Sequence, residues 1–182
     1  MSPGSWEILE MSQRRVFVGI IKPPDLKVTN PWAQTLRELQ LPPGSLIGTV
    51  AGLPFGPARN NLVKTTLEGG FGYCFMLDAD THVPPDCVMK LLGSGFDLVG
   101  GFYKQRFPPH KPAAAMLGVG PNGEQFRADL PAFNVGDTIP VHFLPAGATL
   151  YSRRLLEAIL AKYPRPFEWG PDIDGLTGTK SG

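Results

Sequence analysis

The sequence of 182 residues contains few cysteines, little net charge and no long apolar run. Its two cysteines, Cys74 and Cys87, are too few for a disulfide framework or a zinc cluster, so we expect buried thiols in a reducing, cytoplasmic setting. No apolar stretch approaches the ~20 residues of a membrane-spanning helix, and residues 1–15 contain no run typical of a signal peptide. These absences exclude a disulfide-rich secreted module, and we expect no transmembrane segment.

Charge and composition narrow the class further. The 17 basic and 16 acidic side chains nearly balance, and the basic ones are scattered, so we expect no nucleic-acid partner. Hydrophobic residues make up 42% of the chain and charged residues 18%, which suits a folded domain with a core and excludes a disordered chain. The 22 glycines and 20 prolines follow no period, so they indicate many turns and a loop-rich binding face.

Apolar runs alternate with helical patterns through the N-terminal half of the sequence. Four strands are predicted, at residues 16–21, 46–50, 73–77 and 98–102. The helices predicted between them start near Asn30, Ala58 and Pro84. This alternation predicts an α/β fold, with a mostly parallel central sheet flanked by helices.

The C-terminal half is less regular. Strands are predicted at residues 112–119, 141–144 and 148–151, and Ser152 then caps a helix. The sequence shows no linker and no internal repeat, so we expect a single domain over residues 1–182. Residues 164–182 are rich in glycine and poor in apolar anchors, which predicts a mobile tail or lid.

Two carboxylates, Asp78 and Asp80, come directly after the apolar run 73–77. In open α/β sheets, ligands bind outside the carboxyl ends of the strands. Two neighbouring carboxylates repel each other there, and a divalent cation offsets that repulsion. Mn²⁺ and Mg²⁺ prefer oxygen ligands and accept waters and phosphates in the remaining positions. We therefore expect Asp78 and Asp80 to bind Mn²⁺ or Mg²⁺; the alternative is a solvated turn in which Asp80 acts as a cap.

The segment 73–92, YCFMLDADTHVPPDCVMKLL, resembles the metal-binding segment of nucleotide-sugar glycosyltransferases of the GT-A fold, of the family-two-like kind. Those enzymes carry a strand, a D-x-D and a proline-led helix with an aspartate near its start. Segments 56–70, 97–106 and 144–159 are similar to the preceding helix, the next strand and the acceptor-side segment. The resemblance covers roughly residues 15–169. It implies metal-dependent transfer of a sugar from a nucleotide-diphosphate donor to the hydroxyl of an acceptor, whose nature stays open.

Several residues around the predicted edge of the sheet are candidates for donor binding. Asp25 follows the first strand and is placed for the base or ribose, and Lys104 and Arg106 follow the fourth strand and are placed for the diphosphate. Arg59 and Asn60 begin a helix, where Arg59 can pair with a phosphate or with Asp78 and Asn60 can hold the loop. The alternative for each is an ordinary turn, cap or solvated charge.

The resemblance leaves two possibilities for the catalytic base. Inverting members carry an acidic pair after the acceptor-side segment, whereas this chain has Asp172 and Asp174 in a different context. Either one of them is the base, or the chain is shortened before the pair. Two other functions stay open: a catalytically silent nucleotide-sugar or metal-binding module of a larger assembly, and, more weakly, a nucleotidyltransferase. The latter normally has a glycine- and basic-rich loop where this chain has the sequence KPPD at residues 22–25.

Overall fold

The computed structural model describes residues 14–22, 30–104 and 108–167. They form a five-stranded sheet of order β2-β1-β3-β7-β4 and a separate two-stranded hairpin, β5-β6. The strands of the main sheet are β1 (Val16–Lys22), β2 (Leu46–Ala51), β3 (Tyr73–Asp78), β4 (Leu98–Gly100) and β7 (Ala148–Ser152). The hairpin strands are β5 (Met116–Val119) and β6 (Gln125–Ala128). The helices are α2 (Asn30–Glu38), α3 (Phe55–Glu68), α4 (Cys87–Gly93) and α5 (Arg153–Lys162).

The sheet is mixed but mostly parallel, as predicted. Strands β2, β1 and β3 are parallel to one another. Strand β7 is antiparallel to both β3 and β4, so β4 runs in the same direction as β3. The α/β class and the four strands of the N-terminal half are therefore confirmed. The insertion of β7 between β3 and β4 was not predicted, because nothing in the local sequence pattern states which strands become neighbours.

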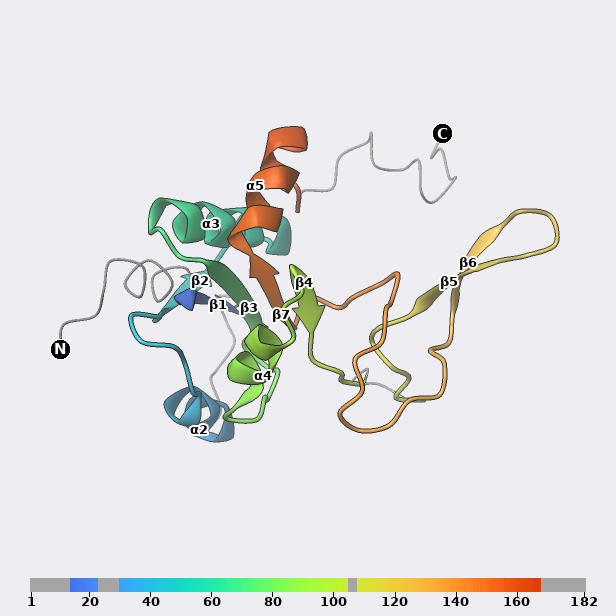
Figure 1. Cartoon of the computed structure of the whole chain (residues 1–182), viewed down its shortest axis with the longest axis horizontal. Coiled ribbons are helices and arrows are strands. Elements are labelled where there is room, and N and C mark those ends of the chain that lie inside the picture. Colours follow the sequence, from blue (N-terminus) through green and yellow to red (C-terminus); the bar gives the residue numbers. More distant parts are fainter. Residues whose placement is uncertain (1–13, 23–29, 105–107, 168–182) are drawn as a thin grey trace.

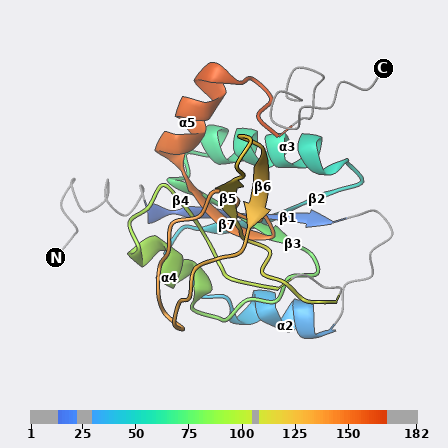
Figure 2. The same ribbon diagram turned by 90° about the vertical axis from the view of Figure 1, so that its right-hand side faces the viewer.

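Helices cover both faces of the sheet: α3 and α5 lie on one side, and α2 and α4 on the other (Figures 1 and 2). Side chains of β3 alternate between the two layers, as the period of two in a strand requires. Met76 packs in the layer with Leu62 of α3 and Leu156 of α5. Phe75 and Leu77 pack in the opposite layer, which α4 closes. Strand β3 is thus buried on both faces and fixes the position of whatever follows it.

Both cysteines are buried, as predicted from the composition. Cys74 lies in β3 and Cys87 at the start of α4, and neither forms a disulfide. Burial raises the pKa of Cys74 to about 12 and that of Cys87 to about 11. Both thiols therefore stay protonated at neutral pH.

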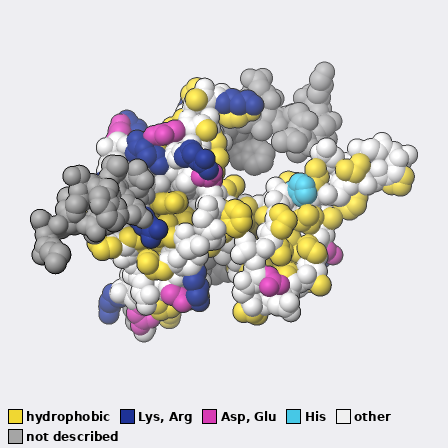
Figure 3. All heavy atoms as spheres, viewed as in Figure 1, with side chains coloured by type: hydrophobic (Ala, Val, Ile, Leu, Met, Phe, Trp, Pro, Cys, Tyr) yellow, Lys and Arg dark blue, Asp and Glu magenta, His cyan; other side chains and the backbone are white. Residues whose placement is uncertain are grey.

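The segment between β4 and β7 departs from the predicted strands. The strand predicted at residues 141–144 was wrong, since that segment makes only an isolated bridge between Ala115 and Phe143. The strand predicted at 112–119 shortens to β5, and its partner β6 was missed because β6 is mostly exposed and lacks an apolar run. Residues 108–143 project from the sheet as a lobe (Figure 1). Hydrophobic side chains gather on its surface (Figure 3), among them Val119, Phe126 and Val135.

Within the described ranges, no helix is both long and apolar enough to cross a bilayer. This agrees with the absence of a long apolar run in the sequence.

Ser152 joins β7 to α5 and closes the sheet at the end remote from the aspartates. Its hydroxyl accepts a hydrogen bond from Leu155 N–H at 3.1 Å, which caps α5, and donates to Asp97 Oδ1 at 2.6 Å. Arg154 pairs with the same carboxylate. The hydrogen bonds from Arg154 and Ser152 hold the pKa of Asp97 below its ordinary value.

We predict that Ser152→Ala lowers the free energy of unfolding by about 1 kcal/mol, because the cap of α5 is lost. Urea denaturation measures the effect, with the exposed Thr65→Ala of α3 as a control that changes it by less than about 0.5 kcal/mol. Equal stability of the Ser152→Ala variant and the wild type would show that the cap contributes nothing.

Candidate functional site

The predicted metal motif lies at the carboxyl edge of the sheet, in its centre. Asp78 is the last residue of β3 and pairs with Ile21 of β1. In the order β2-β1-β3, the chain first forms β2 on one side of β1 and then β3 on its other side. In α/β sheets, ligands bind at the carboxyl ends of the strands where the chain changes sides in this way. The motif thus borders the place where this class of sheet binds ligands.

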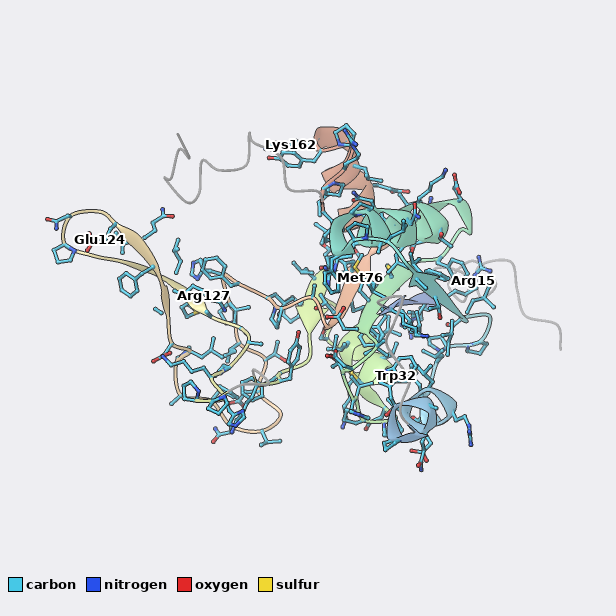
Figure 4. All side chains as sticks on the ribbon, turned by 180° about the vertical axis from the view of Figure 1, so that it is seen from behind. Arg15, Trp32, Met76, Glu124, Arg127 and Lys162 are labelled. Carbon is cyan, nitrogen blue, oxygen red and sulfur yellow. The ribbon has the colours of Figure 1, made fainter. Side chains whose placement is uncertain are left out.

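The backbone between the two aspartates is fixed by packing and by hydrogen bonds to the sheet. Ala79 is only 6% exposed and packs with Ile20 and Trp32, which reaches the sheet from α2 (Figure 4). Ala79 N–H also donates to Ile21 C=O at 3.2 Å, and Thr81 N–H donates to Asp78 C=O at 3.0 Å to form a turn. The small apolar residue of the D-x-D is therefore the anchor, and the exposed Asp80 lies on the turn above it.

Arg59 meets Asp78 across the edge of the sheet. Its Nη2 lies 3.3 Å from Asp78 Oδ1 in a half-buried ion pair, and its guanidinium lies over the ring of Phe55 at 5.5 Å. Arg59 Nε is buried and finds no hydrogen-bond partner among the described residues. The pairing of Arg59 with Asp78 was one of the two roles predicted for this arginine.

Burial raises the pKa of Asp78 above its ordinary value, the Arg59 charge lowers it, and the Asp80 charge raises it again. The half-buried carboxylate thus lies in a site where negative charge is only partly compensated. A further cation at Asp78 lowers the electrostatic free energy of the pair of aspartates.

Two residues that the sequence analysis did not single out complete the site. Gly147 C=O accepts a hydrogen bond from Asp78 N–H at 2.9 Å, and Gly147 N–H donates to the Tyr103 hydroxyl at 3.0 Å. Burial raises the pKa of Tyr103, and the charges of Asp78 and Asp80 raise it further. Tyr103 follows β4, so a search for polar side chains just beyond the carboxyl end of each predicted strand would have found it.

The other predicted residues are distributed as follows. Asn60 Oδ1 accepts a hydrogen bond from Phe167 N–H at 3.2 Å, so this residue holds the chain after α5 against α3. Lys104 is exposed, bridges Pro112 at the base of the lobe, and makes no hydrogen bond or ion pair with the motif in the described part of the chain. Asp25, Arg106, Asp172 and Asp174, and the predicted lid from residue 168 onward, lie outside the described residues.

The residues present suit a weakly held divalent cation. Within the residues that the structure covers, no group of three or more His, Cys, Asp and Glu side chains converges, so Asp78 and Asp80 supply at most two protein ligands. Mg²⁺ and Mn²⁺ prefer hard oxygen donors such as these carboxylates. Waters and phosphate oxygens would fill the coordination positions that the two aspartates leave open. A cavity of about 580 Å³ does not belong to this site, since α3, the end of α5 and the chain after it line it, and neither aspartate does.

Comparisons with known proteins bear on the fold alone. No family model and no curated protein matches the sequence. Among solved structures, A197 from STIV is 16% identical, with a TM-score of 0.56 over 80% of this chain and 68% of that one. HddC from Yersinia pseudotuberculosis is 12% identical, with a TM-score of 0.47 over 90% and 86% of the two chains.

A third solved structure, 4-diphosphocytidyl-2C-methyl-D-erythritolsynthase from Anaerococcus prevotii, is 12% identical, with a TM-score of 0.45 over 91% of this chain and 82% of that one. The TM-scores of HddC and of this synthase are below 0.5, so only the similarity to A197 bears on the fold. That likeness and the mixed sheet flanked by helices show that the chain has an α/β domain of the GT-A-like kind.

We predict that Gly147→Ala displaces Tyr103 and lowers the free energy of unfolding by about 1–2 kcal/mol. A Cβ at residue 147 would lie 2.5 Å from the Tyr103 hydroxyl oxygen, which is closer than van der Waals contact allows. Urea denaturation measures the loss. Gly101→Ala is the matched control, because its Cβ would meet Ala148 at an ordinary 3.9 Å. Equal stability of the two variants would contradict the close packing at Gly147.

Proposed function

We propose that this chain binds a nucleoside-diphosphate sugar across the carboxyl edge of its sheet and transfers the sugar to an acceptor hydroxyl, with Mn²⁺ or Mg²⁺. The observation that carries the proposal is the pair Asp78 and Asp80 at the end of the central strand β3, with Arg59 against Asp78. The GT-A-like fold supports it, because the motif lies at the carboxyl end of a central strand, where such sheets bind ligands.

Each residue has a distinct role in this proposal. Asp78 and Asp80 hold the cation, which supplies charge stabilisation to the departing diphosphate. Arg59 adds a second positive charge from α3 at the same edge. Tyr103 and Gly147 border the site on its β7 side. Asp172 and Asp174 remain candidates for the base that accepts the proton of the acceptor hydroxyl.

We predict that Asp80→Asn removes the metal-dependent part of nucleotide binding. In the wild type, Mn²⁺ tightens the binding of a nucleoside diphosphate, because the phosphates complete a coordination shell that two carboxylates leave open. Isothermal calorimetry with UDP, GDP, ADP and CDP, in Mn²⁺ or in EDTA, measures this gain. The Asp129→Asn variant is a charge-matched control, because Asp129 lies on the lobe and is exposed.

Two results would contradict the metal site. One is an Asp80→Asn variant that keeps the full gain from Mn²⁺, and the other is a wild type in which Mn²⁺ adds nothing for any of the four diphosphates. Incubation of the wild type with nucleotide sugars then tests the reaction itself. Mn²⁺-dependent release of a nucleoside diphosphate supports glycosyl transfer. Consumption of a nucleoside triphosphate with release of pyrophosphate would instead indicate a nucleotidyltransferase, and binding without turnover would indicate a silent module.

We predict opposite effects of Arg59→Gln on metal and on nucleotide. Arg59 pairs with Asp78 Oδ1 and repels a cation at that carboxylate, so its removal strengthens the binding of Mn²⁺ alone by about three- to ten-fold. The same change weakens the binding of the diphosphate, because a positive charge at the phosphates is lost. Titration with Mn²⁺ alone and with diphosphate measures both, and Arg37→Gln, on the exposed surface of α2, is the control. Parallel changes in the two affinities would show that Arg59 acts only on the fold.

A further inference from the structure

We infer that the Tyr103 hydroxyl is a hydrogen-bond donor to the terminal phosphate of the bound nucleotide, and that it makes the site select nucleoside diphosphates over monophosphates. This inference rests on the proposed function, since it assumes a nucleotide whose phosphates reach the Asp78 carboxylate. It concerns a residue that lies outside the D-x-D motif, in the segment that follows β4.

The Tyr103 hydroxyl lies beside the Asp78 carboxylate. A methyl group placed on Gly147 would lie 2.5 Å from the Tyr103 hydroxyl oxygen and 3.2 Å from Asp78 Oδ2. The hydroxyl and this carboxylate oxygen therefore border the same small volume beside the Gly147 backbone. Asp78 Oδ1 is the oxygen that faces Arg59, so Oδ2 is the one on the Tyr103 side. A cation held by Asp78 carries its phosphate ligands within reach of this hydroxyl.

The hydrogen bonds at Tyr103 leave its O–H group available as a donor. The Tyr103 oxygen accepts a hydrogen bond from Gly147 N–H at 3.0 Å, which fixes the phenol from the backbone. No described residue accepts a hydrogen bond from the Tyr103 O–H itself. The phenol is half-buried, and a half-buried donor gains most from a charged acceptor. Phosphate oxygens on a cation at Asp78 are acceptors of this kind.

The order of the strands accounts for the selectivity for a diphosphate. The chain reverses its winding direction between β1 and β3, whereas Gly147 and Tyr103 lie on the β7 and β4 side of Asp78. A nucleotide whose nucleoside binds at the carboxyl ends of β1 and β3 extends its phosphate chain across Asp78 toward Tyr103. The phosphate nearest the nucleoside then lies on the metal side, and only a second phosphate extends to the tyrosine. A monophosphate bound in the same way ends at the metal and does not reach the Tyr103 hydroxyl, so the hydroxyl favours a diphosphate.

The alternative is that the hydrogen bond between Tyr103 and Gly147 only stabilises the lobe, and the test must distinguish this role from phosphate binding. The chain leaves the sheet after Tyr103, forms the lobe and returns at Gly147, so this bond closes the base of the lobe. A purely structural role would change the stability of the lobe and weaken all ligands alike. A role at the terminal phosphate changes the ratio of diphosphate to monophosphate affinity.

The test compares UDP, GDP, ADP and CDP with their monophosphates in Mn²⁺, by calorimetry on the full chain. Tyr103→Phe removes the donor and keeps the ring, and we expect it to weaken the best diphosphate by about ten-fold or more. The matching monophosphate should change by less than about two-fold. Tyr73→Phe is the matched control, because it removes a hydroxyl at the opposite end of β3, and both affinities should stay unchanged.

A second variant tests the same hydroxyl by displacing it. Gly147→Ala displaces the hydroxyl without removing it, so it should reproduce the selective loss of diphosphate affinity. Equal losses for diphosphate and monophosphate, or no loss in either variant, would overturn the inference. If Asp80→Asn abolishes the gain from Mn²⁺ while Tyr103→Phe leaves the ratio intact, the role of Tyr103 is wrong and the proposed function stands. If no diphosphate binds the wild type, the proposed function fails first, and the inference fails with it.

Discussion

The site depends on one pairing, the antiparallel contact of β7 with the carboxyl half of β3. Through it, the backbone N–H of Asp78 is bonded to Gly147 C=O, and Gly147 N–H is bonded in turn to Tyr103. A side chain at residue 147 would fill the space between the two strands, which is why only glycine fits there without displacing a neighbour. Gly147 therefore connects the end of β3, which carries the predicted metal motif, with Tyr103 in the segment after β4.

The charges of the site follow from this placement. Because β3 is buried on both faces, its last residue is a half-buried carboxylate with limited access to water. Arg59 compensates part of its charge, and the nearby Asp80 adds to the uncompensated part. Under the proposed function, we expect such a site to bind a cation weakly by itself and more strongly with a phosphate, since neither ligand alone satisfies all the charges.

The lobe of residues 108–143 has few buried side chains. Its Phe133 packs edge-to-face on Phe102, the neighbour of Tyr103 in the sequence, with the ring centroids 5.1 Å apart. Arg127 and Glu124 on its hairpin lie far from the core marked by Met76 (Figure 4). Tyr103 precedes the lobe in the sequence and Gly147 follows it, so their hydrogen bond joins the two ends of the chain at the base of the lobe.

The sequence by itself determined the α/β class, the four parallel strands, the two buried thiols, the cap at Ser152 and the position of Asp78 and Asp80 at the end of β3. These are local properties, because the periodicity of strands and helices, their caps and their ends depend on residues close together in the sequence. The sequence did not determine that β7 lies between β3 and β4. It also did not determine that Arg59 forms its ion pair with Asp78, or that Gly147 donates a hydrogen bond to Tyr103. Those contacts join residues far apart in the chain, so they depend on how the layers pack, and only the tertiary structure decided them.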